Sequence, residues 1–360
     1  MQRPATFVTF ALCFFLSLIH SSAPAYREYF TPEQKAQLEK IQTVLVDVIT
    51  ITDKGGVDAG ALIDLVAQRL NEMGYAVVRD PTQSHDVVLH MKCEQRKTWQ
   101  GSTATGGDAD LPDAPSRLWK GPACQLTYEL GGMKIKWQKE VRTEFDDAVT
   151  AAQAARAADP GTYAIVQLQE VLTKYEFPLL LAAEWGHADR LLKMLDSPDI
   201  SHVRKIKIIS LLGDMQADEA FPKLKEALTD RDLAKQAIAS MGNLGKDGIP
   251  LLVDMMNSSP QVDIQAAAAK GLGQIGGING DASVVPPLLA KLQDPKADWV
   301  VLTEIAWALG KVPDKRAIQP LYALDKKLQA IRDPDNVSLK KLKEAVFWAI
   351  KQCDTWDQYS

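Results

Sequence analysis

The residues AKQAIASMG at 234–242 indicate the fold of this chain, because their pattern recurs through the second half. The matching stretches are IKIISLLG at 206–213, AAAAKGLG at 266–273 and LTEIAWALG at 302–310. Each places small and apolar residues at helical spacing before a final Leu-Gly or Met-Gly step, and these steps lie 29, 31 and 37 residues apart. Recurrence at such a period is typical of stacked helical repeats.

A second pattern belongs to the same units. It reads EAFPKL at 219–224, DGIPLL at 247–252, SVVPPLL at 283–289 and RAIQPL at 316–321. Proline suits the first turn of a helix and glycine suits its C-terminal cap. We therefore expect each unit to contain one helix with proline in its first turn and a second helix with glycine at its C-terminal cap. A single helix pair cannot bury its apolar face, so we expect the units to stack into one continuous core.

These two recurring patterns resemble the HEAT repeat, in particular the short bacterial type that is also found in phycobilin lyases. The resemblance covers about residues 187–353 and implies an all-α superhelical solenoid over residues 187–360. Residues 151–186 are expected to form a helical linker that caps the N-terminal end of this solenoid. The resemblance identifies an architecture and leaves the ligand open.

Residues 26–150 predict a small α+β sandwich, in which a helix covers one face of a mainly antiparallel sheet. Runs rich in Val and Ile or alternating in polarity predict strands over 43–52 and 86–99. Apolar residues at helical spacing predict a helix that starts at Asp58 and ends at Gly74.

A hairpin over residues 124–145 is the clearest element of this domain. Apolar and polar residues alternate on both sides of a turn of two glycines, and such a turn tolerates positive φ. A two-residue turn pairs Leu130 with Met133 and Leu126 with Trp137. These pairs fall on one apolar face, so the register is self-consistent.

The cysteines that follow the N-terminal segment are Cys93, Cys124 and Cys353. Cys93 and Cys124 fall on apolar strand faces, and a disulfide between them is possible in an oxidising compartment. Residues 100–122 predict a long acidic loop between them, which leaves their register open; its aspartates lack the spacing of a calcium loop. The pattern favours buried thiols over the disulfide.

Residues 1–25 have the features of a cleavable signal peptide. Arg3 supplies the positive charge near the N-terminus, and an apolar run covers 5–19. Ala-Pro-Ala at 23–25 predicts cleavage before Tyr26. The alternative is a membrane anchor, but the apolar run is shorter than the roughly 20 residues that span a bilayer. We therefore expect a periplasmic or secreted protein with no transmembrane segment after cleavage.

Charge argues against a nucleic-acid partner. Residues 26–186 carry 17 Lys and Arg against 23 Asp and Glu, whereas residues 187–360 carry 23 of each. Neither part has the basic stripe that neutralises phosphates. We expect instead one or more protein partners in the cell envelope.

No residue pattern predicts chemistry. His90 and Cys93 lie three apart on one strand and face opposite sides, and His187 and His202 have no Cys or His neighbour at ligand spacing. We therefore expect no metal site, no cofactor and no catalytic residue. Two hypotheses follow: a non-catalytic binding scaffold, which we favour, or a HEAT-repeat enzyme of the lyase or hydroxylase type. HEAT-repeat hydroxylases carry His-Glu pairs, and this sequence contains none.

Alignment of the repeated helices on their Leu/Met-Gly steps separates core from surface positions. Three residues before the Leu or Met, every unit is apolar: Ile209, Ile238, Ala269 and Ala306. Five and two residues before it, the chemistry varies from unit to unit. The candidate partner-binding residues from these variable rows are Lys207, Gln236, Lys270, Glu304 and Trp307. Trp307 suits an aromatic anchor, and it equally suits packing against the neighbouring unit.

Overall fold

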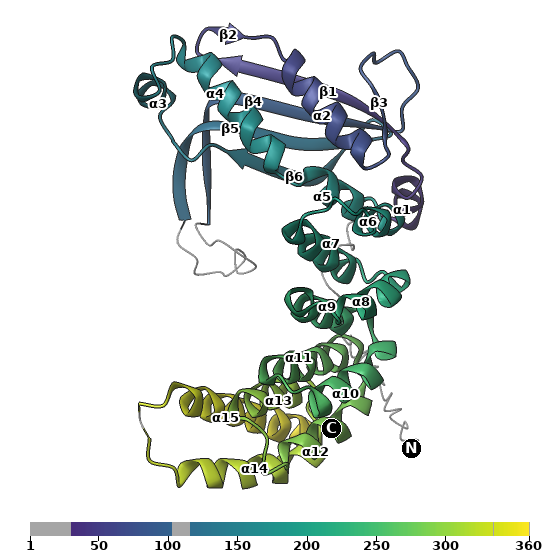
Figure 1. Ribbon diagram of the computed structural model, residues 1–360, viewed down its shortest axis with the longest axis vertical. Coiled ribbons are helices and arrows are strands. Elements are labelled where there is room, and N and C mark those ends of the chain that lie inside the picture. Colours follow the sequence, from purple (N-terminus) through teal and green to yellow (C-terminus); the bar gives the residue numbers. More distant parts are fainter. Residues whose placement is uncertain (1–29, 103–115, 334, 360) are drawn as a thin grey trace, which may run out of the picture.

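The computed structural model describes residues 30–102, 116–333 and 335–359, so the expected signal peptide at 1–25 lies outside the described residues. Its first half is a six-stranded sheet in the order β2-β1-β4-β5-β6, with β3 also paired to β1 (Figure 1). The strands are β1 (Thr43–Thr52), β2 (Gly55–Gly56), β3 (Ala76–Val78), β4 (Val87–Ser102), β5 (Ser116–Leu130) and β6 (Met133–Arg142).

The sheet is mixed, and three of its five strand pairings are antiparallel, in line with the expectation of a mainly antiparallel sheet. Strand β1 pairs in parallel with β3 and β4, whereas β4, β5 and β6 are antiparallel neighbours. Helix α2 (Gly60–Glu72) lies between β1 and β3 in the chain. A helical crossover of this kind returns the chain in the same direction, which makes the next strands parallel to β1. Gly74, at φ 81°, ends the helical segment as the sequence predicts.

Helices α2 and α4 (Pro160–Lys174) cover the same face of the sheet, and the short α3 (Ala148–Ala154) precedes α4 (Figure 1). Helix α4 contacts β1, β4, β5 and β6. The buried Arg69 of α2 donates hydrogen bonds to the backbone carbonyls of Leu172 and Thr173 at the end of α4, and pairs with Glu176 at 3.0 Å. The structure thus places much of the expected linker at 151–186 against the sheet.

The hairpin around the two glycines forms, but its register differs from the expected one beyond the turn. Leu130 pairs with Met133 as expected, whereas Leu126 pairs with Lys139 instead of Trp137. A bulge in β6 adds two residues between these pairs. Two extra residues preserve the alternation of faces, so Trp137 stays buried on the core side.

Strands β4 and β5 continue into the expected polar loop. Their backbones pair as far as Ser102 and Ser116, so residues 100–102 and 116–122 of the expected loop are strand. The aspartates of this segment lie outside the described residues.

Cys93 and Cys124 form a disulfide, so the preference for buried thiols was wrong. They are directly opposed in the β4–β5 register, with Cα atoms 3.9 Å apart and both side chains fully buried. The sequence could not give this register, because it depends on how far the two strands continue into the segment between them. Cys353 is a free, buried thiol.

A cluster of buried aromatic rings joins the sheet to the helices that follow. The Trp185 ring, at the end of α5 (Phe177–Glu184), packs against Tyr75 and Tyr128 at centroid distances of 5.1 and 5.8 Å. The Tyr75 hydroxyl lies 2.7 Å from Nδ1 of His187. Burial raises the pKa of Tyr75 and lowers the pKa of His187. Both shifts favour a neutral imidazole that accepts the tyrosine proton in a hydrogen bond.

The second half consists of helix pairs that Figure 1 shows stacked one after another, away from the sheet. Consecutive members of the series α7, α9, α11, α13 and α15 contact one another. Apart from the short α1 (Pro32–Leu38), the remaining helices are α6 (Ala188–Leu195), α7 (His202–Asp214), α8 (Phe221–Ala227), α9 (Arg231–Leu244), α10 (Ile249–Ser258), α11 (Val262–Asn279), α12 (Val285–Leu292), α13 (Trp299–Lys311), α14 (Lys315–Gln329) and α15 (Val337–Tyr359).

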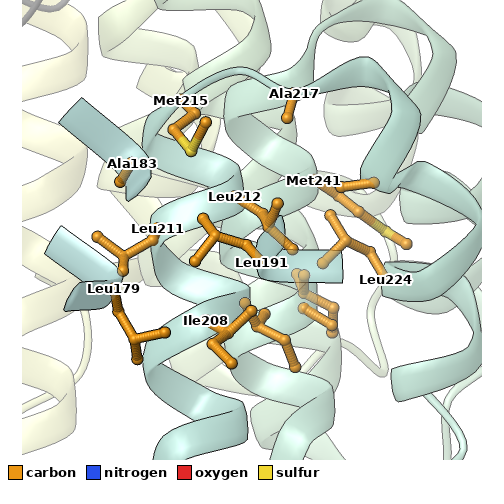
Figure 2. Packing of buried hydrophobic residues seen from close by; sticks show 14 of the residues in the cluster. Leu179, Ala183, Leu191, Ile208, Leu211, Leu212, Met215, Ala217, Leu224 and Met241 are labelled. Carbon is orange, nitrogen blue, oxygen red and sulfur yellow. The ribbon is translucent and has the colours of Figure 1, made fainter. Parts of the chain in front are cut away.

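Apolar side chains from successive helices form one core. Figure 2 shows Leu191 of α6 and Leu224 of α8 converging on Leu212 of α7, with Met241 of α9 beside them. These four side chains are fully buried. Each helix therefore loses part of its apolar contact if its neighbour is removed. In the described part of the chain, no helix is both long and apolar enough to cross a membrane.

The disulfide predicts the number of reactive thiols. We expect a purified chain of residues 26–360, denatured without reductant, to contain one reactive thiol, that of Cys353. Serine at both Cys93 and Cys124 should lower the free energy of unfolding by about 3 kcal/mol, because the bond closes a loop in the unfolded chain. Thiol titration and urea unfolding measure the two effects. Cys353→Ala is the control and should give no reactive thiol; three thiols in the parent chain would contradict the bond.

Candidate interaction surface on the second helices

Helices α7, α9, α11 and α13, called here the second helices, pass each other at close backbone contact. A Cβ atom on Gly213 would lie 2.6 Å from Cα of Ser240, and one on Gly273 would lie 2.7 Å from Cα of Ala308. Neither glycine has the positive φ of a left-handed cap. The repeated glycines were expected to close the helices. They lie inside the helices instead, where the next helix leaves no room for a side chain.

Other residues mark the helix ends. Gly245 and Gly280, at φ 103° and 65°, follow the last residues of α9 and α11. The prolines of the first three proline patterns lie in the first turns of α8, α10 and α12, as expected. Pro320 is an exception: α14 begins at Lys315, so this proline lies inside the helix.

The alignment of the repeats places its apolar row in the core. All four members of that row are 0% exposed, which confirms the periodicity: Ile209, Ile238, Ala269 and Ala306. Ser240 is buried beside them, and its hydroxyl donates a 2.8 Å hydrogen bond to the backbone carbonyl of Ile209. This bond joins α7 to α9 at the glycine crossing.

The variable rows reach the surface of the same helices. Lys207 and Lys270 are exposed, whereas Gln236, Glu304 and Trp307 are half-buried. Within the described residues, these side chains form no ion pair with one another. Their helices are successive neighbours in the stack, so the five residues belong to one series of adjoining helices.

Trp307 packs against the neighbouring unit while part of its surface stays accessible. Its ring centroid lies 5.0 Å from that of Trp348 on α15. The Trp348 ring also occupies the space that a side chain on Gly310 would need. The two tryptophans therefore pack α13 against α15. Replacement of Trp307 is expected to lower the stability of the fold as well as to affect any binding.

A group of possible metal ligands lies at the start of two second helices. One ligand atom from each of His202, Asp230 and Asp232 lies within 4.8 Å of the others, and all three side chains reach solvent. Asp230 already caps α9 by accepting a 3.0 Å hydrogen bond from the backbone N–H of Asp232. Inspection of neighbouring residues missed this group, because its members come from two units; the repeat period aligns them.

The repeated helix pairs, their glycine crossings and the buried row define a helical-repeat protein. Residues 249–334 match the family model of HEAT repeats, so this part of the chain carries HEAT repeats. No curated protein matches the chain. A solved structure of human deoxyhypusine hydroxylase in complex with glycerol is similar over 57% of this chain and 90% of that one, with 14% identity and a TM-score of 0.27.

The expectation that the protein is not an enzyme is corrected by this comparison. The hydroxylase is an enzyme, and its chain is among those that match. An exclusion of catalysis therefore does not hold. The low TM-score carries no activity over to the present chain.

The glycine crossings predict opposite effects for two substitutions in α11. Gly273→Ala should lower the free energy of unfolding by about 2 kcal/mol or more, because the new methyl group overlaps Ala308. Gly277→Ala is the matched control: its Cβ would lie 3.5 Å from the nearest atom, an ordinary contact. Alanine favours helix there by up to about 1 kcal/mol. Chemical unfolding of both variants measures the difference, and equal stabilities would show that the crossing does not require glycine.

Proposed function

We propose that the helical region is an α-solenoid that binds a protein partner across the exposed positions of its second helices. The observation that carries this proposal is the contrast between the two kinds of row. The buried row is apolar in every unit, whereas the variable rows include the exposed Lys207 and Lys270 and the half-buried Gln236 and Glu304. Positions without a common packing partner are free to differ from unit to unit, and stacked repeats commonly bind partners on such surfaces.

The charges of this surface favour a protein over a nucleic acid. Residues 187–360 carry equal numbers of basic and acidic residues. Lys207 and Lys270 supply cations, and Glu304 supplies an anion on a neighbouring helix. Mixed charges of this kind match a protein surface with its own mixed charges, and they give specificity more than raw affinity.

We also propose that the protein acts in the periplasm or outside the cell, on a partner in the cell envelope. Support comes from the small-x-small sequence at 23–25 and from the disulfide between Cys93 and Cys124, a bond typical of oxidising compartments.

Charge reversal on two second helices tests the binding surface. Lys207→Glu together with Lys270→Glu should weaken capture of the partner about tenfold, because each change replaces a weak attraction by repulsion. The control is Lys225→Glu with Lys315→Glu, which makes the same change of charge on the first helices α8 and α14. Envelope extracts are passed over each immobilised variant, and bound proteins are quantified by mass spectrometry.

The expected result is a partner held by the parent and by the control variant and lost from the variant with changes on α7 and α11. Circular dichroism checks that all variants keep their helices. A partner held equally by both variants would place binding outside this surface.

N-terminal sequencing tests the proposed export. Protein isolated from its native cells should begin at Tyr26, because the small residues at 23–25 suit cleavage by a signal peptidase. The chain expressed without residues 1–25 is the control for the mass of the processed form. A soluble intracellular product that keeps Met1 would contradict export.

A further inference from the structure

The outer edge of β6 borders a groove in the sheet domain. Strand β6 pairs with β5 on one side, and no other strand in the described part of the chain pairs with its second side. The groove has a volume of about 570 Å³. It is lined by every residue of β6 from Met133 to Lys139, together with Phe30, Gln34 and Glu184. An unpaired strand edge is a template for a further strand, because its backbone N–H and C=O groups point outward.

The lining of this groove suits a peptide with alternating character. Phe30, Met133, Ile135 and Trp137 supply apolar surface, and Met133 is 53% exposed. An extended chain points successive side chains to opposite sides, so every second residue of a bound strand can contact this apolar surface. At about 3.3 Å per residue, a peptide of roughly seven residues would cover the length of β6 that lines the groove.

Charge decides which strand the groove accepts. Lys134 and Lys139 line it, and neither forms an ion pair with another residue that the structure describes. Lys136 lines it as well. Lysines on an edge strand discourage pairing with an identical edge, because like charges repel. The same lysines attract a strand that carries acidic side chains.

We propose that the groove beside β6 binds an extended acidic peptide segment of another protein, which adds a strand to the sheet. The site lies beside β6, with Glu184 of α5 at its border, and involves none of the residues proposed for binding on the second helices. It therefore adds a second interaction surface to the protein, and it stands or falls independently of the first.

The test uses synthetic peptides of about eight residues that alternate Asp or Glu with Val or Ile. Fluorescence anisotropy of a labelled peptide measures its affinity for the purified full chain. Lys134→Glu with Lys139→Glu should weaken binding about tenfold at low salt, since exposed charge pairs contribute modestly and reversal makes them repulsive. Lys225→Glu with Lys315→Glu, on helices α8 and α14, is the control with equal net charge and should bind like the parent. A peptide with Lys in place of its acidic residues should not bind.

Backbone methylation distinguishes strand addition from simple charge attraction. Successive N–H groups of an extended peptide point to opposite edges, so N-methylation of alternate residues blocks one edge. Of two acidic peptides methylated in the two alternate registers, one should lose binding and the other should keep it. Equal binding of both would overturn the added strand, and so would failure of the unmethylated acidic peptide to bind the parent chain more tightly than it binds the Lys134→Glu, Lys139→Glu variant.

Discussion

Close backbone crossing of the second helices is the constraint on which the helical half depends. At Gly213 and Gly273, the neighbouring helix comes so near that even a methyl group would overlap its backbone. Close approach brings the apolar row of each unit into contact with the next, and it allows Ser240 to reach a backbone carbonyl across the interface. A larger residue at a crossing would push two helices apart and open the core on both sides, since cores tolerate extra volume poorly.

The same principle of shared burial joins the two halves of the protein. The Trp185 ring belongs to the end of the first helix of the stack, yet it packs against Tyr75 and Tyr128 of the sheet domain. Arg69 adds a polar connection, because its guanidinium satisfies carbonyls at the end of α4 and a carboxylate just beyond. Buried charges need such partners. The sheet therefore closes the open end of the helical stack, an end that would otherwise expose apolar surface to water.

This arrangement gives the protein two surfaces of different character. The second helices present single side chains from successive units on a rigid support, which suits recognition of a folded partner. The edge of β6 presents a continuous backbone beside apolar and basic side chains, which suits an extended segment. The two surfaces share no residue, so a mutation in one can be studied while the other serves as an internal reference.

Features that depend on local periodicity could be predicted from the amino-acid sequence. The repeat, the buried row from Ile209 to Ala306, the glycine turn of the hairpin and the existence of a sheet domain all follow from residue spacing, because a helix and a strand repeat with fixed periods. The candidate surface positions on the second helices follow from the same spacing. Their binding role stays a proposal.

Features that depend on contacts between distant segments could be seen in the folded chain alone. The bond between Cys93 and Cys124 needed the strand register, the direction of β4 beside β1 needed the crossover of α2, and the placement of α4 needed its contacts with the sheet. The role of the repeated glycines also required the neighbouring helix. A glycine that ends a helix is set by its own positive φ, and one that admits a close crossing is set by the backbone of the next helix, so the two look the same in the sequence.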